Sequence, residues 1–130
     1  MKLGNIFEKD TTPVSYPTGS VIFNEGQARD VMYVVKTGEV DILVCGQIAE
    51  TVSPDGFFGE LALIDKSPRS ATAVAKTDCS LIPITEKQFL FLVQETPFFA
   101  LTVMATLARR IRSRNAQFGV MPVSTKTGAE

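Results

Sequence analysis

Between residues 14 and 84 the chain alternates short apolar runs with polar turn residues, a pattern that predicts a series of short β-strands. Glycine, asparagine, aspartate and proline are concentrated between the runs, where tight turns need them. Short strands at this regular spacing are typical of an antiparallel sandwich or barrel. Pro83 is expected at a strand edge or end, because proline cannot donate to the ladder. The predicted strands are 21–23, 31–35, 40–44, 48–52, 71–75 and 79–82.

After residue 84 the apolar positions recur at helical spacing, which predicts two helices. Thr85 is the expected N-cap of the first, over residues 86–93. The second runs from about residue 97 to 117, with Pro97 in its first turn. Residues 1–12 are expected to form a short N-terminal helix or arm. The predicted fold is therefore mainly β, an antiparallel jelly-roll barrel with a short N-terminal helix and two C-terminal helices.

The composition describes one ordinary globular domain and excludes several function classes. Of the 130 residues, 45% are hydrophobic and 21% are charged, and the net charge is −1, which gives no overall basic field for nucleic acid. The chain has no histidine, which removes histidine-based metal sites, Ser-His triads and histidine general bases. We therefore expect no catalytic residue and no metal site. The predicted domain is 1–120, followed by a polar, disordered tail over 121–130.

The two cysteines and the start of the chain indicate a cytoplasmic protein. Cys45 and Cys79 lie in apolar, strand-like contexts without CxxC spacing, so we expect two small buried side chains in a reducing compartment. The first eight residues contain no apolar leader segment. The longest apolar run, over 98–108, is far shorter than the roughly 20 residues that a membrane span requires. We therefore expect no membrane association.

The stretch 57–73 carries the candidate chemistry, with the sequence FFGELALIDKSPRSATA. Gly59 allows a ligand to approach the backbone closely. Residues 60–64 fit one helical turn, whose first N–H groups favour an anion. Arg69 offers a fork of donors that matches a phosphate, and the adjacent Ser70 adds a hydroxyl. Glu60 would repel a bare phosphate but would accept a hydrogen bond from a sugar hydroxyl, so the set suits a nucleotide. An ion pair between Glu60 and Arg69 that merely holds a loop is the structural alternative.

This stretch resembles the phosphate-binding cassette of cyclic-nucleotide-binding domains, such as those of the catabolite activator protein and of cAMP-dependent kinase regulatory subunits. The matching runs are 58–63 and 68–72, and the resemblance extends over about residues 10 to 117. It implies that Arg69 neutralises the cyclic phosphate, and that Ser70 and the backbone N–H groups around Leu61 and Ala62 complete the phosphate shell. It also implies that Glu60 binds the ribose 2′-hydroxyl, where Gly59 gives backbone access.

The resemblance also gives expectations for the base. A serine after the cassette arginine, here Ser70, favours cAMP over cGMP, although its hydroxyl would also suit guanine. In the family the helix after the barrel closes over the base and often pairs two subunits. By this likeness Arg114 would stack on the purine and Asn115 would contact a base edge. The same helix is a candidate homodimer surface, and the alternative is that it packs on its own barrel.

The resemblance leaves the output open. No helix-turn-helix follows the last helix, so no DNA-binding domain is expected, and the arginines near its end suit a solvated face and the helix dipole. The chain would act through an effector protein or be part of a longer one. The resulting prediction is a cyclic-nucleotide receptor without catalysis or cofactor. The alternative is a jelly-roll dimerisation or interaction module that binds no nucleotide.

Overall fold

A computed structural model describes residues 12–28 and 30–117 of the protein. The chain divides into two compact units, Met1–Leu92 and Val93–Glu130, and each is described by itself. The strands are β1 (Val14–Tyr16), β2 (Val21–Phe23), β3 (Val31–Thr37), β4 (Val40–Val44), β5 (Gln47–Val52), β6 (Phe57–Phe58), β7 (Thr72–Ala75) and β8 (Cys79–Thr85). The helices are α2 (Leu61–Ile64), α3 (Glu86–Glu95) and α4 (Phe98–Gln117).

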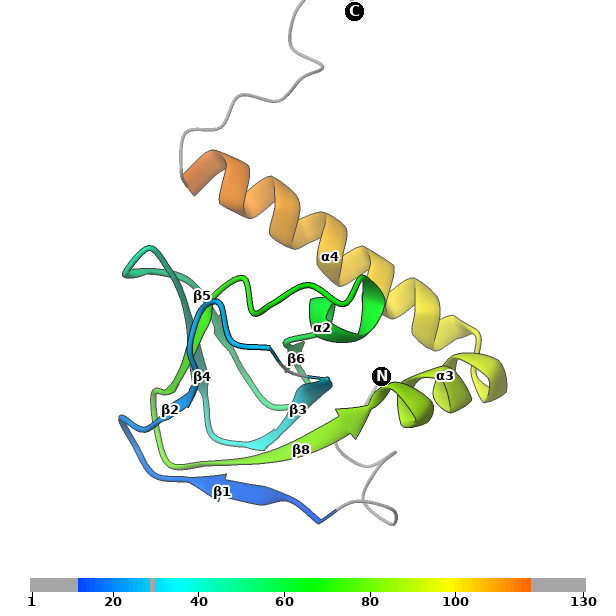
Figure 1. Ribbon diagram of the computed structural model, residues 1–130, viewed down its shortest axis with the longest axis horizontal. Coiled ribbons are helices and arrows are strands. Elements are labelled where there is room, and N and C mark those ends of the chain that lie inside the picture. The colour runs from blue at the N-terminus through cyan, green and yellow to red at the C-terminus, as the bar shows by residue number, and fades with distance from the viewer. Residues whose placement is uncertain (1–11, 29, 118–130) are drawn as a thin grey trace, which may run out of the picture. The chain divides into compact units, whose positions relative to one another are not determined.

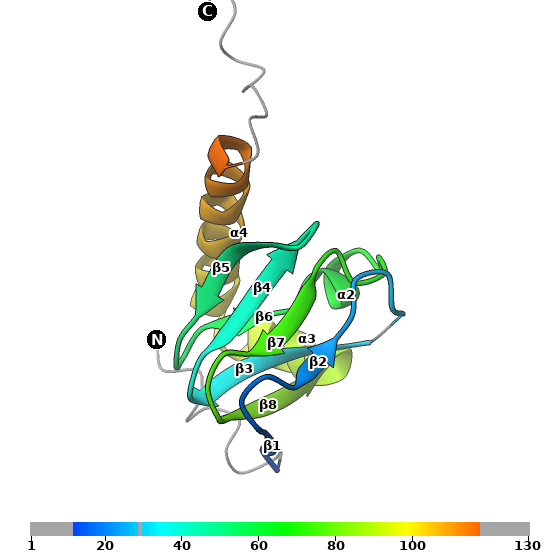
Figure 2. The same ribbon diagram turned by 90° about the vertical axis from the view of Figure 1, so that its left-hand side faces the viewer.

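The strands of the first unit form two antiparallel four-stranded sheets (Figure 1). The sheet orders are β1-β8-β3-β6 and β2-β7-β4-β5, and Figure 2 shows the second sheet lying across the first. The mainly β, antiparallel class is thus confirmed. The described strands do not close into the predicted barrel, because β1, β2 and β6 are only two or three residues long and their ladders end early.

The core of the first unit lies between the two sheets. Alternate residues of β3 and β8 enter it, including Tyr33, Val35 and Leu81. The intervening residues Val34 and Ile82 are also fully buried, so both faces of these two strands lie away from solvent. This double burial explains why β3 and β8 have nearly continuous apolar sequences instead of an alternating pattern.

The strand predictions hold in outline, and β1 and β6 are additions. β3 extends to Thr37 and β8 to Thr85, beyond the predicted ends. Pro83 lies inside β8 and not at its end. It is tolerated there because β1 pairs with β8 only between Cys79 and Leu81, so no ladder partner is lost on that side.

Thr85 and Gln88 form a capping box that starts α3. The Gln88 N–H donates to the Thr85 hydroxyl oxygen at 3.2 Å, and the Thr85 N–H donates to Gln88 Oε1 at 2.9 Å. The predicted cap is thereby confirmed. In the second unit α4 begins one residue after Pro97, close to its predicted start.

The helix set differs from the prediction in number and position. The four-residue α2 corresponds to the helical turn expected over 60–64 and is not counted among the helices of the predicted fold, while the predicted N-terminal helix and the polar tail 121–130 fall largely or wholly outside the described residues. No single helix of the described part is long and apolar enough to cross a membrane; only α3 and α4, taken together as a bent pair, meet the requirement of length and composition.

Candidate functional site

The stretch 57–73, called the cassette below, connects the two sheets of the first unit. It starts at β6 in one sheet, passes through Gly59, α2 and a loop, and enters β7 in the other. The backbone of Arg69 fixes this loop from outside, since its N–H donates to the Gln27 carbonyl at 2.8 Å and its carbonyl accepts from the Gly26 N–H at 2.7 Å. The cassette is therefore anchored to the segment between β2 and β3.

Arg69 is buried to 4% exposure, an unusual position for a charged side chain that must be offset by polar contacts. Its Nη1 donates to the Gly59 carbonyl oxygen at 2.9 Å, and its Nη2 donates to the Val31 carbonyl oxygen at 2.7 Å. The two carbonyls accept from the two different Nη atoms of the fork. They hold the plane of the guanidinium in one orientation.

Gly59 is the residue that makes room for this guanidinium. Its φ of +79° is in the left-handed region, and a Cβ added there would lie 2.6 Å from Nη1 of Arg69. Both the backbone conformation and the close approach require glycine. The predicted approach of a ligand to the backbone at Gly59 stays a prediction; in this structure the group that lies close to Gly59 is an arginine of the same chain.

Glu60 occupies the N-cap position of α2 and is buried to 6% exposure. Leu61 and Ala62 form the first turn, and the Ala62 N–H contacts the Gly59 carbonyl oxygen at 3.4 Å. That carbonyl therefore lies between the start of α2 and the Arg69 fork. The predicted helical turn exists. It places Glu60, Leu61 and Ala62 beside the oxygen that Arg69 binds.

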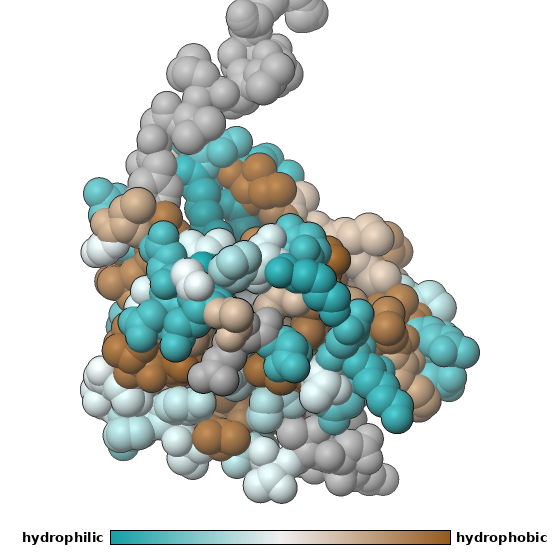
Figure 3. Space-filling model, viewed as in Figure 1, coloured by the Kyte–Doolittle hydropathy of each residue, from teal (hydrophilic) through white to brown (hydrophobic). Residues whose placement is uncertain are grey.

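The loop after α2 forms an exposed corner, and Figure 3 shows hydrophilic residues over this part of the surface. The Ser67 N–H donates to Asp65 Oδ1 at 3.0 Å, and hydrogen bonds from the Ser67 side chain and backbone hold the pKa of Asp65 below its usual value. Lys66, at a φ of +62°, forms a 2.6 Å ion pair with Glu86 in the first turn of α3. Ser70, next to Arg69, is exposed.

Arg69 lies over a cluster of three aromatic rings, two of which the sequence did not connect with the cassette. The Arg69 Cζ lies 4.1 Å from the Phe23 ring centroid and 6.0 Å from that of Tyr33. Phe23 in turn lies 5.8 Å from Phe58, and Tyr33 lies 5.5 Å from Phe58. Only Phe58 belongs to the cassette, so no local motif could identify the other two.

Arg114 and Asn115, the predicted base contacts, lie on α4 in the second unit and are half-buried. Their contact with a ligand base stays a prediction. The neighbouring Arg110 is buried to 7% exposure, so it does not belong to the solvated face that was expected for the arginines near the end of this helix.

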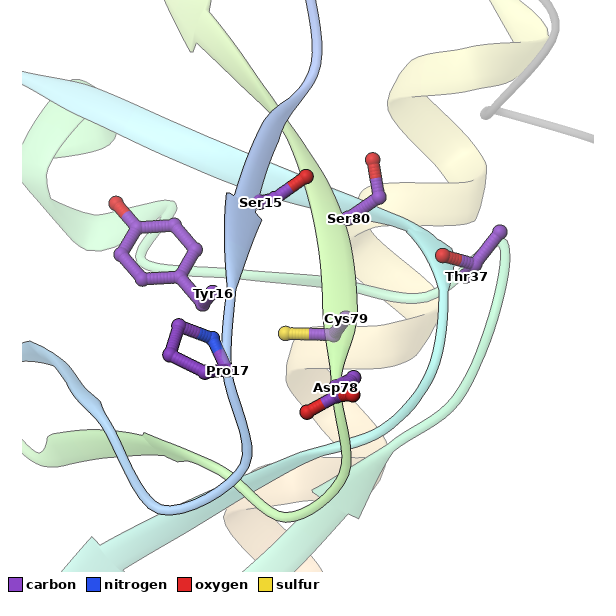
Figure 4. Close-up of a pocket in the computed structure, with 7 residues that line it drawn as sticks. All are labelled: Ser15, Tyr16, Pro17, Thr37, Asp78, Cys79 and Ser80. Carbon is purple, nitrogen blue, oxygen red and sulfur yellow. The ribbon is translucent and has the colours of Figure 1, made fainter.

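A surface pocket of about 410 Å³ lies away from the cassette, at the meeting of β1, β3 and β8 (Figure 4). The backbone N–H and hydroxyl of Thr18 donate to Asp78 Oδ1, each at 2.8 Å, and lower the pKa of Asp78. Burial, with the charge of Asp78, raises the pKa of the Cys79 thiol. The lining residues are Ser15, Tyr16, Pro17, Thr37, Asp78, Cys79 and Ser80.

The cysteine prediction is half right. Cys79 is buried as expected, but Cys45 is exposed at the turn between β4 and β5, with a φ of +52°. The prediction is wrong for Cys45 because Val44 pairs with Gln47, which leaves Cys45 and Gly46 as a two-residue hairpin turn outside the ladder. Within residues 12–28 and 30–117, no three histidine, cysteine, aspartate or glutamate side chains gather into a possible metal site.

The comparisons with known proteins bear on this geometry. The family model for the cyclic nucleotide-binding domain matches residues 13–96. The "Cyclic AMP receptor protein" of Thermus thermophilus is 32% identical over 111 residues, which cover 82% of this chain and 51% of that protein. The chain thus spans about half the length of this curated relative.

Two solved structures share the fold. The Thermus thermophilus catabolite activator protein aligns with a TM-score of 0.75 and 30% identity, over 89% of this chain and 57% of that one. A structure from a study of a cyclic-GMP-dependent signalling pathway that regulates bacterial phytopathogenesis aligns with a TM-score of 0.72 and 26% identity. It covers 86% of this chain and 95% of that one.

Proposed function

Because the chain belongs to the cyclic nucleotide-binding domain family, we propose that it is a receptor domain that binds a cyclic nucleotide and transmits a conformational change without catalysing a reaction. The observation that carries this proposal is the buried, oriented guanidinium of Arg69 at the centre of the cassette. A buried guanidinium held in one orientation offers an arrangement of donors that suits an anion such as a phosphate.

The phosphate would meet the guanidinium in an orientation that the protein has already set. Arginine matches the two free oxygens of a cyclic phosphate because its N–H groups form a rigid planar fork. The carbonyls of Gly59 and Val31 reduce the ordering that binding would otherwise require. The Ser70 hydroxyl and the N–H groups of Leu61 and Ala62 complete the proposed phosphate shell.

The proposed ribose contact is Glu60, with Gly59 giving access to the backbone. Its position at the start of α2 places a carboxylate within the same cassette as Arg69, which suits a ligand that has both a phosphate and a hydroxyl. We assign Arg114 as the residue that stacks on the base and Asn115 as a base-edge contact. The proposed domain extends over residues 1–120.

We favour cAMP over cGMP. Ser70 follows the cassette arginine, and the relative with the higher identity is named for cyclic AMP. One solved structure that is 26% identical to this chain comes from a study of a cyclic-GMP-dependent signalling pathway, so cGMP is the competing ligand. Discrimination between the bases would depend on few hydrogen bonds, which makes the ratio of the two affinities the informative quantity.

The output would pass through α4 to a second copy or to an effector protein. Leu101, Met104 and Ile111 are all about 60% exposed and recur on α4 at spacings of three and seven residues, which suits pairing between helices. We propose a homodimer through this face. A ligand would shift the output only if it bound one of two conformations more tightly than the other.

The test is calorimetric titration of the purified chain with cAMP and, separately, with cGMP, after any bound nucleotide has been removed. We expect saturable binding of one nucleotide per chain, with cAMP the tighter ligand. Arg69→Leu should lose at least about 100-fold in affinity, because the phosphate would be desolvated without its charged partner.

Controls keep the result interpretable. Because Arg69→Leu also removes two buried hydrogen bonds, its fold is checked by circular dichroism, and Glu60→Gln serves as a second variant with a weaker ribose contact. Absence of heat with both nucleotides, on folded and ligand-free protein, would overturn the receptor proposal. It would support the alternative of an interaction module that binds no nucleotide.

A further inference from the structure

The ring of Phe23, the last residue of β2, covers one face of the Arg69 guanidinium. The Arg69 Cζ lies 4.1 Å from the ring centroid, well inside the distance at which a cation is attracted by an aromatic face. Phe23 and Arg69 are both 4% exposed. Since water is nearly excluded from this pair, the attraction is stronger than at a protein surface.

Two other aromatic rings, from different strands, pack against Phe23 and restrict its position. Tyr33 of β3 is 6.2 Å from it and nearly parallel, with an interplanar angle of 27°, and Phe58 of β6 is 5.8 Å away. A Cβ added at Gly59 would lie 3.5 Å from Phe23 Cε2, so a side chain at this position would come into van der Waals contact with the ring. The three rings form one packed aromatic cluster against which the Arg69 guanidinium lies.

The guanidinium is thus fixed in two independent ways. The carbonyls of Gly59 and Val31 bind its edge and set its rotation within the plane. The Phe23 ring lies against its face and sets the height and tilt of that plane. Either contact alone would leave a degree of freedom that an incoming phosphate would have to restrict, at a cost in binding free energy.

We propose that Phe23 is a positioning residue for the anion site: it holds Arg69 in the orientation in which the guanidinium meets the phosphate, without contacting the phosphate itself. This inference depends on the proposed function, because it concerns the ligand that Arg69 would bind. If Phe23 has this role, part of the nucleotide affinity depends on β2, 46 residues before Arg69, and not on the cassette motif alone.

The experiment measures cAMP and cGMP affinity by calorimetry for the parent, Phe23→Leu, Phe23→Met and Phe23→Tyr. Leucine and methionine fill much of the space but have no aromatic face, whereas tyrosine keeps the ring. We expect both aliphatic variants to lose about 3- to 30-fold in affinity and Phe23→Tyr to stay within about 3-fold of the parent. Methionine, being flexible, preserves the test if leucine packs too poorly to fold.

Leu81→Val is the control for a general loss of stability. Leu81 is a fully buried core residue on β8 and belongs to neither the cassette nor the ring cluster. It should lower the melting temperature, as Phe23→Leu does, but leave both affinities unchanged. The loss in the Phe23 variants should be equal for cAMP and cGMP, because the two ligands share the phosphate.

Three results would overturn the inference. The first is parental affinity in both aliphatic variants. The second is a loss of affinity in Phe23→Tyr as large as that in Phe23→Leu. The third is a loss of affinity that differs between cAMP and cGMP, which would show that the ring contacts the base. If the parent itself binds neither nucleotide, the proposed function fails and this inference with it. Binding by the parent and equal binding by the aliphatic variants would overturn the inference alone.

Discussion

The cassette carries two cations three residues apart, and the protein holds them in opposite ways. Arg69, on the inner side, is buried, and two backbone carbonyls and an aromatic ring fix it. Lys66, on the outer corner, is 61% exposed and has one ion pair with Glu86, itself 49% exposed. Equal charge therefore does not mean equal importance: the surroundings decide how much each contact contributes.

The physical reason is solvent. A buried donor or acceptor that loses its partner costs its full desolvation energy, since water cannot replace the bond. An exposed ion pair gains little, because water and salt screen it and two long side chains must be ordered. Substitutions on the two sides of the cassette should therefore differ strongly in effect, and four predictions test this.

Arg69→Lys should have the largest effect on the fold. Lysine keeps the charge but cannot place donors on both the Gly59 and Val31 carbonyls, which would leave a buried acceptor without its bond. We expect the free energy of unfolding to fall by about 2–4 kcal/mol, measured by urea denaturation. A loss below about 0.5 kcal/mol would contradict a structural role for the inner side.

Gly59→Ala should come next, at about 1–3 kcal/mol. It combines an unfavourable backbone conformation with a Cβ placed 2.6 Å from Arg69 Nη1. Gly46→Ala is the matched control, since Gly46 has the same φ of +79° but a Cβ added there would meet nothing within 4 Å. The excess loss in Gly59→Ala over Gly46→Ala isolates the crowding against the guanidinium, and equal losses would refute it.

On the outer corner, the Lys66–Glu86 pair should contribute only about 0.2–1 kcal/mol. The measurement is a double-mutant cycle with Lys66→Gln, Glu86→Gln and the double variant, by urea denaturation at low and at high salt. The coupling should shrink as salt increases. A larger, salt-independent coupling would mean that the corner is as strongly held as the inner side.

Asp65 should give the smallest effect, visible only in acid. Its pKa in the folded protein lies below the ordinary value because of the Ser67 hydrogen bonds. The folded state therefore prefers the charged carboxylate, and this stabilisation is present above about pH 4 and is lost as the pH falls below it. Melting temperature measured against pH should fall less steeply in Asp65→Asn than in the parent. An identical slope would show that the bond is absent in solution.

The sequence predicted what is local and missed what is distant. The cassette, the Thr85 cap and the bounds of α4 depend on residues within a turn or two of one another, so their spacing identifies them. The partners of Arg69 are the carbonyl of Val31, 38 positions away, and the ring of Phe23. Such contacts form only when β2 and β3 are brought to the cassette, and no periodicity encodes them.

Two fold errors have the same origin. The two-residue β6 is too short to show any alternation, so only its pairing with Tyr33 and Val34 defines it as a strand. Closure of the barrel likewise depends on how far neighbouring ladders extend, which is a property of the assembled sheets. The apolar pattern fixes the class of the fold but not the ends of its ladders.

The contrasting positions of the two thiols have a practical consequence for any study of self-association. Cys79 is buried, and burial raises its pKa and further disfavours the reactive thiolate, whereas Cys45 is exposed at a hairpin tip. Under air oxidation two chains would become covalently joined through Cys45, and a size measurement would report a dimer that owes nothing to α4. The same exposure makes Cys45 a single point for attaching a fluorescent dye, close to the end of the cassette, since Leu43 of the same hairpin pairs with Thr72.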